Sequence, residues 1–330
     1  MEVLCGKPID PAILKLKHDK AAACEANRQF CESLSRNVCA CPVCGNNRRT
    51  PLVEVYNFSY AECLHCSLVY IENPPTPQEI ERLYNSAFYD EVEQSLYGDV
   101  KVSGYRIEWV AAPKVRYVEE RLGRKGKWLD VGCGTGEILA AARARGWVVQ
   151  GVETNQRAAQ IGAERFGVPI SKGFITDSEH LRQLSEFDVV SMFGVLEHLY
   201  EPGKVIDSVS KGMPDSGVLV IEVPHYPSVS CFSQMAFPNF VDRILVPPMH
   251  LMVFTLQALQ YLLRRSNIEI THVWFYGQDF HEWLSTLSAM CPKVVNRRIF
   301  EDLMEMNGEI QQVIDNHHLS DEMLVIARKC

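Results

Sequence analysis

From about residue 113 the chain alternates short apolar runs with helix-like segments, and this alternation constrains the fold more than any other feature. Several of the apolar runs are continuous, as expected of strands that are covered on both faces. We predict strands at residues 127–132, 148–153, 187–193, 217–223, 268–276 and 322–329, and helices at 136–145, 155–166, 202–212 and 255–266. This order of elements predicts a doubly wound α/β domain.

A glycine-rich loop, LDVGCGTGEIL at residues 129–139, follows the first predicted strand and leads into a helix. Glycines allow a backbone to approach a ligand closely. The spacing is G-x-G-x-G, whereas the dinucleotide fingerprint requires G-x-G-x-x-G, so a dinucleotide oxidoreductase is disfavoured. Two acids, Asp130 and Glu153, flank the loop, and no P-loop lysine follows it. The loop therefore suits a cofactor that carries positive charge and no phosphates, with Glu153 placed to accept hydrogen bonds from ribose hydroxyls.

Two C-x-x-C pairs lie in the first quarter of the chain. They form C-x2-C-x18-C-x2-C from Cys41, Cys44, Cys63 and Cys66, which is the spacing of a zinc site. The four thiols fill a tetrahedron, so the metal would be structural and would replace a core that so short a segment cannot build. Cys39 and His65 are alternative ligands, and a redox pair is the alternative to zinc.

Composition limits the classes of protein to which the chain can belong. With 47% apolar residues among 330, it can bury a sizeable core. Its net charge of −8 disfavours a nucleic-acid partner bound through phosphates. No apolar run is long enough for a bilayer span, and the first residues do not read as a secretory signal. We therefore expect a cytoplasmic protein without a membrane partner, and among its twelve cysteines the paired thiols indicate metal binding rather than disulfides.

The chain divides by composition into four parts. Residues 10–36 read as a helix within an N-terminal arm, and NPPTP at 73–77 reads as a stiff break. Thr76 is the expected N-cap of the helix that follows. We predict a helical arm at 1–38, a zinc-binding knuckle at 39–75, a helical lid or linker at 76–112, and an α/β domain at 113–330 with a helical insertion at 279–320.

The chain from about 113 to 276, with the strand at 322–329, resembles the class I S-adenosylmethionine-dependent methyltransferases. The stretches that carry the resemblance are LDVGCGTG, GVETN, FDVVSMFGVLEHLYEP at 187–202 and HLMVFT at 250–255. The resemblance implies a Rossmann-like sheet and S-adenosylmethionine as the cofactor. The cysteine-rich front end is similar to the N-terminal parts of some bacterial methyltransferases that act on sugars and other small metabolites.

The resemblance also assigns cofactor contacts. Asp130 and the loop residues Gly132, Cys133, Gly134 and Gly136 would hold the methionine part, and Glu153 the ribose. Phe174, Ile175 and Asp177 would line the adenine. Phe193, at the end of the strand at 187–193, would flank the sulfonium.

Two histidines are candidates for proton removal from an acceptor. In some O-methyltransferases a base or metal ligand stands where His198 does, and Glu197 could orient it. Only one Glu-His pair is present, so no magnesium site is predicted. His250 resembles a proton-removing histidine of zinc-containing sugar C-methyltransferases, although the preceding PPM departs from that pattern. The alternative for both histidines is a structural role.

These observations predict a methyltransferase that acts on an O or C atom of a small metabolite or sugar, with oligomeric state open. One alternative is an RNA or protein methyltransferase that uses the knuckle for recognition. It would need a basic surface built from Arg48, Arg49, Arg121, Arg124, Lys125 and Lys127. Another alternative is a binding module that retains the cofactor fold without catalysis.

Overall fold

The computed structural model describes residues 20–84 and 100–330, and these form parts of two compact units. Unit 1 comprises Met1–Ile80, Val223–Leu259 and Trp274–Met323, and unit 2 comprises Glu81–Glu222, Gln260–Val273 and Leu324–Cys330. The predicted knuckle at 39–75 and the predicted insertion at 279–320 both fall in unit 1, although more than 200 positions separate them in the sequence.

A seven-stranded sheet has the order β10-β11-β8-β7-β4-β5-β6. Its strands are β4 (Lys127–Val131), β5 (Val148–Glu153), β6 (Ile170–Lys172), β7 (Val189–Phe193), β8 (Val218–Pro224), β10 (Ile268–Tyr276) and β11 (Glu322–Lys329). β4 pairs in parallel with β5 on one side and with β7 on the other. β5 in turn pairs in parallel with β6, and β7 pairs in parallel with β8. The six predicted strands are confirmed. The three-residue β6 was not predicted, because so short a segment has no periodicity to detect.

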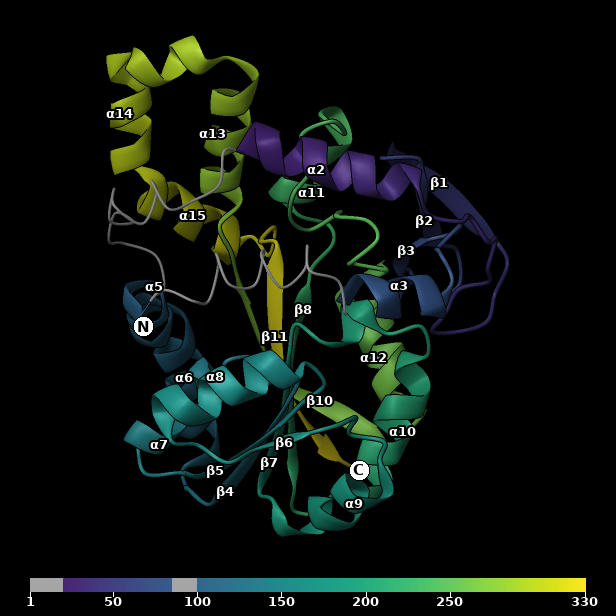
Figure 1. The fold of residues 1–330 in the computed structure, drawn as a ribbon, viewed down its shortest axis with the longest axis vertical. Helices are drawn as coiled ribbons and strands as arrows, with labels where there is room; N and C mark the ends of the chain where they lie inside the picture. The colour runs from purple at the N-terminus through teal and green to yellow at the C-terminus, as the bar shows by residue number, and fades with distance from the viewer. Residues whose placement is uncertain (1–19, 85–99) are drawn as a thin grey trace. The chain divides into compact units, whose positions relative to one another are not determined.

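Helices cover both sides of the parallel strands, which confirms the doubly wound α/β fold. Figure 1 shows α7 and α8 on one side of the strands and α9 and α10 on the other. The helices of this part are α5 (Val100–Arg106), the π-helical turn η1 (Ile107–Ala111), α6 (Ala112–Leu122), α7 (Glu137–Ala144), α8 (Gln156–Phe166), α9 (Ser178–Gln183), η2 (Leu184–Glu186), η3 (Leu196–His198), α10 (Pro202–Gly212) and α12 (Leu256–Arg264). The four predicted helices are present as α7, α8, α10 and α12.

Local chemistry accounts for both ends of α8. Asn155 caps α8, because its side chain accepts hydrogen bonds from the backbone N–H groups of Arg157 and Ala158 at 2.9 and 3.0 Å. Gly167 ends the same helix in the left-handed conformation, with φ of +61°. All seven residues of β8 are buried, as a strand covered on both faces requires.

A small antiparallel sheet in unit 1 has the order β1-β2-β3-β9. Its strands are β1 (Arg49–Val55), β2 (Phe58–Cys63), β3 (Val69–Ile71) and β9 (Met252–Val253). β9 comes from the predicted HLMVFT stretch and pairs with β3 in the register Val69↔Val253 and Tyr70↔Met252. The fourth strand of the sheet is thus supplied from about 180 positions further along the chain.

The remaining helices are α2 (Lys20–Glu32), α3 (Pro77–Tyr84), α11 (Val229–Ala236), α13 (Asp279–Met290), the 3₁₀ turn η4 (Pro292–Asn296), α14 (Arg298–Glu305) and α15 (Asn307–Asn316). Thr76 and Glu79 form the expected start of α3. Glu79 Oε2 accepts hydrogen bonds from the N–H and hydroxyl of Thr76 at 2.8 and 2.7 Å, which is a capping box. The predicted arm helix is described from Lys20 onward, and its earlier residues lie outside the described part.

Among the residues that the structure describes, no helix combines the length and the apolar character needed to cross a bilayer.

Candidate cofactor site and metal centre

The glycine loop leaves β4 at its carboxyl end and enters α7. Gly132, Gly134 and Gly136 have φ of +67°, +52° and +82°, a region that side-chain-bearing residues rarely adopt. A Cβ on Gly132 would lie 2.7 Å from Cγ2 of Val195, whereas a Cβ on Gly134 would meet no described atom within 4 Å. The first glycine is therefore required by packing, and the second lies against open space that a ligand could enter.

The carboxylate of Glu153, at the end of β5, anchors this loop. Its Oε2 accepts a hydrogen bond from the backbone N–H of Gly134 at 2.7 Å, and its Oε1 accepts one from the N–H of Asn155 at 2.8 Å. The side chain is buried. Because β4 and β5 are parallel neighbours, their carboxyl ends bring the loop and this carboxylate to one edge of the sheet.

Asp130 lies beneath the loop and is almost fully buried. Its Oδ1 accepts a hydrogen bond from the hydroxyl of Ser191 on β7 at 2.6 Å, and that hydroxyl accepts one from Nε1 of Trp128 at 2.7 Å. Burial raises the pKa of Asp130 to about 7, against the opposing effect of the Ser191 hydrogen bond, and the nearby carboxylate of Glu153 adds to the rise. Its carboxyl group thus links β4 to β7 through the hydroxyl of Ser191.

The residues expected at the adenine and the sulfonium have different environments. Phe174 is exposed, while Ile175 is buried. Asp177 directly precedes α9 as its N-cap residue, and its Oδ2 accepts a hydrogen bond from the N–H of Phe174 at 2.8 Å. Phe193 ends β7 and is half-buried. Burial raises the pKa of Cys133 well above its usual range, so this residue stays a thiol and fits a small loop position rather than a nucleophile.

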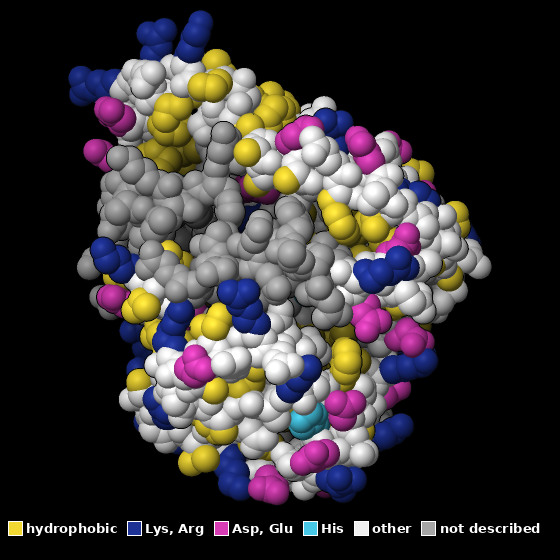
Figure 2. Space-filling model, in the orientation of Figure 1, with side chains coloured by type: hydrophobic (Ala, Val, Ile, Leu, Met, Phe, Trp, Pro, Cys, Tyr) yellow, Lys and Arg dark blue, Asp and Glu magenta, His cyan; other side chains and the backbone are white. Residues whose placement is uncertain are grey.

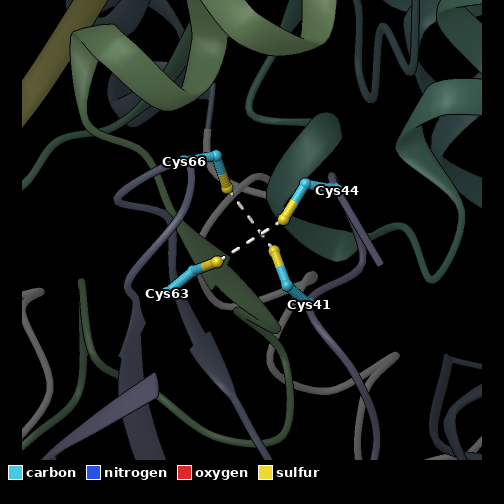
Figure 3. A group of neighbouring side chains, drawn as sticks. All are labelled: Cys41, Cys44, Cys63 and Cys66. Carbon is cyan, nitrogen blue, oxygen red and sulfur yellow. Dashed lines mark hydrogen bonds between the residues drawn. The ribbon is translucent and has the colours of Figure 1, made fainter. Parts of the chain in front are cut away.

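The four predicted ligand cysteines converge in unit 1. Figure 3 shows their Sγ atoms directed toward a common centre from two segments of chain. Cys41 Sγ lies 3.6 Å from Cys66 Sγ, and Cys44 Sγ lies 3.5 Å from Cys63 Sγ. A tetrahedron with Zn–S bonds of 2.3 Å has sulfur–sulfur edges of about 3.8 Å, so the four thiols fit zinc. Cys39 lies outside this cluster, with its Sγ 3.6 Å from the carbonyl of Ile71.

Comparison with known proteins identifies the family. A family profile described as "Methyltransferase domain" matches residues 105–273, just over half of the chain. The chain belongs to this methyltransferase domain family.

Curated relatives include ubiquinone biosynthesis O-methyltransferases from Pseudomonas savastanoi pv. phaseolicola and from Pseudomonas syringae pv. tomato. The first is 35% identical over 98 residues, covering 28% of this chain and 42% of that protein; the second is 32% identical over 109 residues, covering 32% and 47%. The matched stretch thus spans less than half the length of these relatives.

Solved structures share the fold of the methyltransferase domain. Magnesium protoporphyrin IX methyltransferase from Synechocystis PCC 6803 superposes with a TM-score of 0.50 at 13% identity, covering 77% of this chain and all of that one. A possible histamine N-methyltransferase from Thermotoga maritima gives a TM-score of 0.50 at 15% identity, covering 76% and 99%. These likenesses and the family profile confirm a class I S-adenosylmethionine-dependent methyltransferase domain, preceded by a small sheet that carries four cysteines.

The methyltransferase domain contains a buried ion pair that the sequence analysis did not predict. Nζ of Lys114 on α6 lies 2.8 and 2.7 Å from the two carboxylate oxygens of Glu222, which is near the carboxyl end of β8. The same ammonium lies 5.6 Å from the ring centroid of Phe193. Glu222 is the one charged residue in the apolar run GVLVIEV, and this is the signal that could have identified it.

The two candidate histidines lie in different units. His198 ends η3, after β7 in unit 2, with its Nε2 3.8 Å from Oε1 of Glu197, whose side chain is buried. His250 is in unit 1, two residues before β9. Its Nδ1 donates a hydrogen bond to the carbonyl of Ile244 at 2.9 Å, so that in the neutral ring Nε2 is the nitrogen that carries the lone pair.

Proposed function

We propose that the chain transfers the methyl group of S-adenosylmethionine to an O or C atom of a small-molecule acceptor, and that Cys41, Cys44, Cys63 and Cys66 hold a structural zinc ion. The observation that carries the proposal is the loop of positive-φ glycines anchored by Glu153. It offers a close backbone approach and a carboxylate, the features that suit a cofactor with ribose hydroxyls and a cationic centre. The carboxylate of Glu153 places a negative charge at this loop, which favours a sulfonium.

The ubiquinone biosynthesis O-methyltransferases among the relatives support an oxygen acceptor. Methyl transfer to a hydroxyl or an acidic C–H requires removal of a proton as the new bond forms. We propose His250 as the base, because its Nδ1–H is held by the carbonyl of Ile244 and its Nε2 is set to accept. His198, with Glu197 beside it, is the second candidate.

Charge placement supports a small molecule over RNA as the acceptor. Most of the basic residues that an RNA site would use are paired with acids: Arg49 with Glu72, Arg121 with Glu120, Arg124 with Asp188, Lys125 with Glu119 and Lys127 with Glu186. Figure 2 shows Lys and Arg interspersed with Asp and Glu over the face that it draws. Paired charges release few counterions, so they contribute little to phosphate binding.

The test is transfer of labelled methyl from S-adenosylmethionine to a cell extract divided into small-molecule, RNA and protein pools. Glu153→Ala serves as the inactive variant, and Glu164→Ala, an exposed carboxylate on α8, is the matched control. We expect label in the small-molecule pool, present with Glu164→Ala and lost with Glu153→Ala. Label in RNA or protein would overturn the acceptor class. No binding of S-adenosylmethionine by calorimetry would overturn the enzyme assignment.

With the acceptor identified, His198→Gln and His250→Gln separate the two bases. Loss of a general base lowers kcat by about 10²–10⁴-fold and removes the limb of the pH profile that reports its ionisation. We expect this from His250→Gln. If His198→Gln gives this result and His250→Gln does not, the roles are reversed.

A further inference from the structure

The segment at residues 241–251, which carries His250, is hydrogen-bonded to the small sheet of unit 1 and to the turn between its first two strands. The hydroxyl of Tyr60 on β2 donates a hydrogen bond to the backbone carbonyl of His250 at 2.9 Å. The N–H of Ile71 on β3 donates one to the carbonyl of Leu251 at 2.9 Å, and β9 then continues the sheet beside β3. Nearer the start of the segment, the hydroxyl of Tyr56 donates to the carbonyl of Val241 at 2.8 Å.

The strands that make these contacts are joined through the cysteine cluster. β2 ends at Cys63, and β3 begins three residues after Cys66, so two of the four cysteines lie in the turn of one hairpin. The N–H of Cys63 donates to the carbonyl of Leu68 at 2.8 Å, and the N–H of Ser67 donates to the carbonyl of Cys63 at 2.9 Å. An interaction that fixes the conformation of this turn also fixes the register in which β2 pairs with β3, the two strands that contact the segment of His250.

Tyr60 is fully buried, and a phenylalanine ring would fill the same space. A buried hydroxyl costs free energy unless it is hydrogen-bonded, so the hydroxyl of Tyr60 is explained by the carbonyl that it meets. Together with the bond from His250 Nδ1 to Ile244, it fixes both the backbone and the ring of His250.

We propose that Tyr60 is a positioning residue, and that the cysteine hairpin uses it to hold the imidazole of His250 in one tautomer and one orientation. The effect on turnover rests on the proposed function, since it requires His250 to be the base. The effect on the imidazole itself does not. This division allows the two proposals to fail separately.

Tyr60→Phe removes the hydroxyl alone, and Tyr70→Phe is its matched control. Tyr70 is an equally buried tyrosine on the adjoining strand, and its hydroxyl forms no hydrogen bond within the described part of the chain. The first readout is NMR of protein labelled with ¹⁵N in the histidine rings, with the signals of His250 assigned by their loss in His250→Gln. Bound zinc per chain is measured for each variant to show that the hairpin is intact.

In the wild type and in Tyr70→Phe we expect neutral His250 to be protonated at Nδ1. In Tyr60→Phe we expect signals from both tautomers and a fall in kcat of about tenfold, with KM for S-adenosylmethionine unchanged. A tenfold fall corresponds to about 1.4 kcal/mol of transition-state stabilisation. A tautomer unaffected by Tyr60→Phe would overturn the proposal.

If Tyr60→Phe does not fold, the wild type decides the question. A mixture of tautomers for His250 in the wild type contradicts a fixed imidazole, and the single Nδ1–H tautomer supports it. If Tyr60→Phe changes the tautomer of His250 but the wild type transfers no methyl group, the proposed function is refuted and the positioning role still stands.

Discussion

The carboxylate of Glu153 accepts a 2.7 Å hydrogen bond from the backbone N–H of Gly134, so the acid at the end of β5 holds the middle of the loop that follows β4. A hydrogen bond to an ionised group contributes about 1.5–3 kcal/mol. We therefore expect Glu153→Ala to weaken binding of S-adenosylmethionine by at least tenfold in calorimetry. Glu164→Ala, on the exposed side of α8, should bind as the wild type does, and equal affinities for the two variants would contradict the anchoring role.

Two glycines of the loop should respond differently to alanine. At Gly132 the new Cβ would lie 2.7 Å from Val195, so Gly132→Ala should lower the melting temperature, and Val195→Ala in the same chain should restore part of it. At Gly134 the Cβ meets no described atom within 4 Å, so Gly134→Ala should cost only the left-handed backbone strain of about 1–2 kcal/mol. Its main effect should be weaker binding of S-adenosylmethionine, because the methyl group enters the space proposed for the ligand. Similar melting and binding for both variants would contradict this assignment.

The features predictable from the sequence were those encoded over a few neighbouring residues. The apolar runs, the glycine loop and the four cysteines each carry their signal within a short window, and the structure confirms the elements that they predict. β9 could not be predicted as a strand of the small sheet, because two residues have no period and its partner Val69 lies 184 positions earlier. The contact between Tyr60 and His250 depends on the same long-range pairing.

The buried pair of Lys114 and Glu222 was missed for a related reason. Its members are 108 positions apart, and only the fold brings them together. Removing one member of a buried pair leaves the other charge uncompensated, which typically costs 3–5 kcal/mol. We expect Lys114→Met to lower the free energy of unfolding by about that amount in urea titrations. The double variant Lys114→Met/Glu222→Met should recover much of the loss. If its loss in free energy of unfolding equals the sum of the losses of the two single variants, the ion pair is not the cause.

The cysteine cluster should bind one zinc ion per chain, measured by elemental analysis after gel filtration. Cys41→Ser with Cys44→Ser removes two of the four thiolates, so zinc should be lost and the melting temperature should fall. Cys39→Ser is the control, because Cys39 lies in the same segment but outside the cluster. Binding of S-adenosylmethionine should persist in the double variant, since the glycine loop belongs to the other unit. Full zinc content in the double variant would contradict the ligand assignment.

The buried carboxyl of Asp130 should make stability depend on pH. Burial raises its pKa in the folded protein to about 7 from an ordinary value of 3.8, so between these values the folded chain keeps a proton that the unfolded chain releases. Unfolding then releases protons, and the contribution of Asp130 to stability falls as pH rises from about 4 to 7, beyond which it levels off. Asp279 in unit 1 has a pKa raised to about 7 by burial and contributes in the same direction.

Asp130→Asn distinguishes the contribution of Asp130 to the pH dependence from that of Asp279. The amide oxygen of the new side chain can still accept the hydrogen bond from Ser191, and no ionisation remains at this position. The melting temperature of the variant relative to the wild type should therefore increase steadily from pH 4 to pH 7. Asp279→Asn should show the same trend independently, because the two side chains belong to different units. A difference between Asp130→Asn and the wild type that stays constant over this range would mean that Asp130 ionises at its ordinary pKa. The lowering of its pKa by the Ser191 hydrogen bond would then balance the raising by burial.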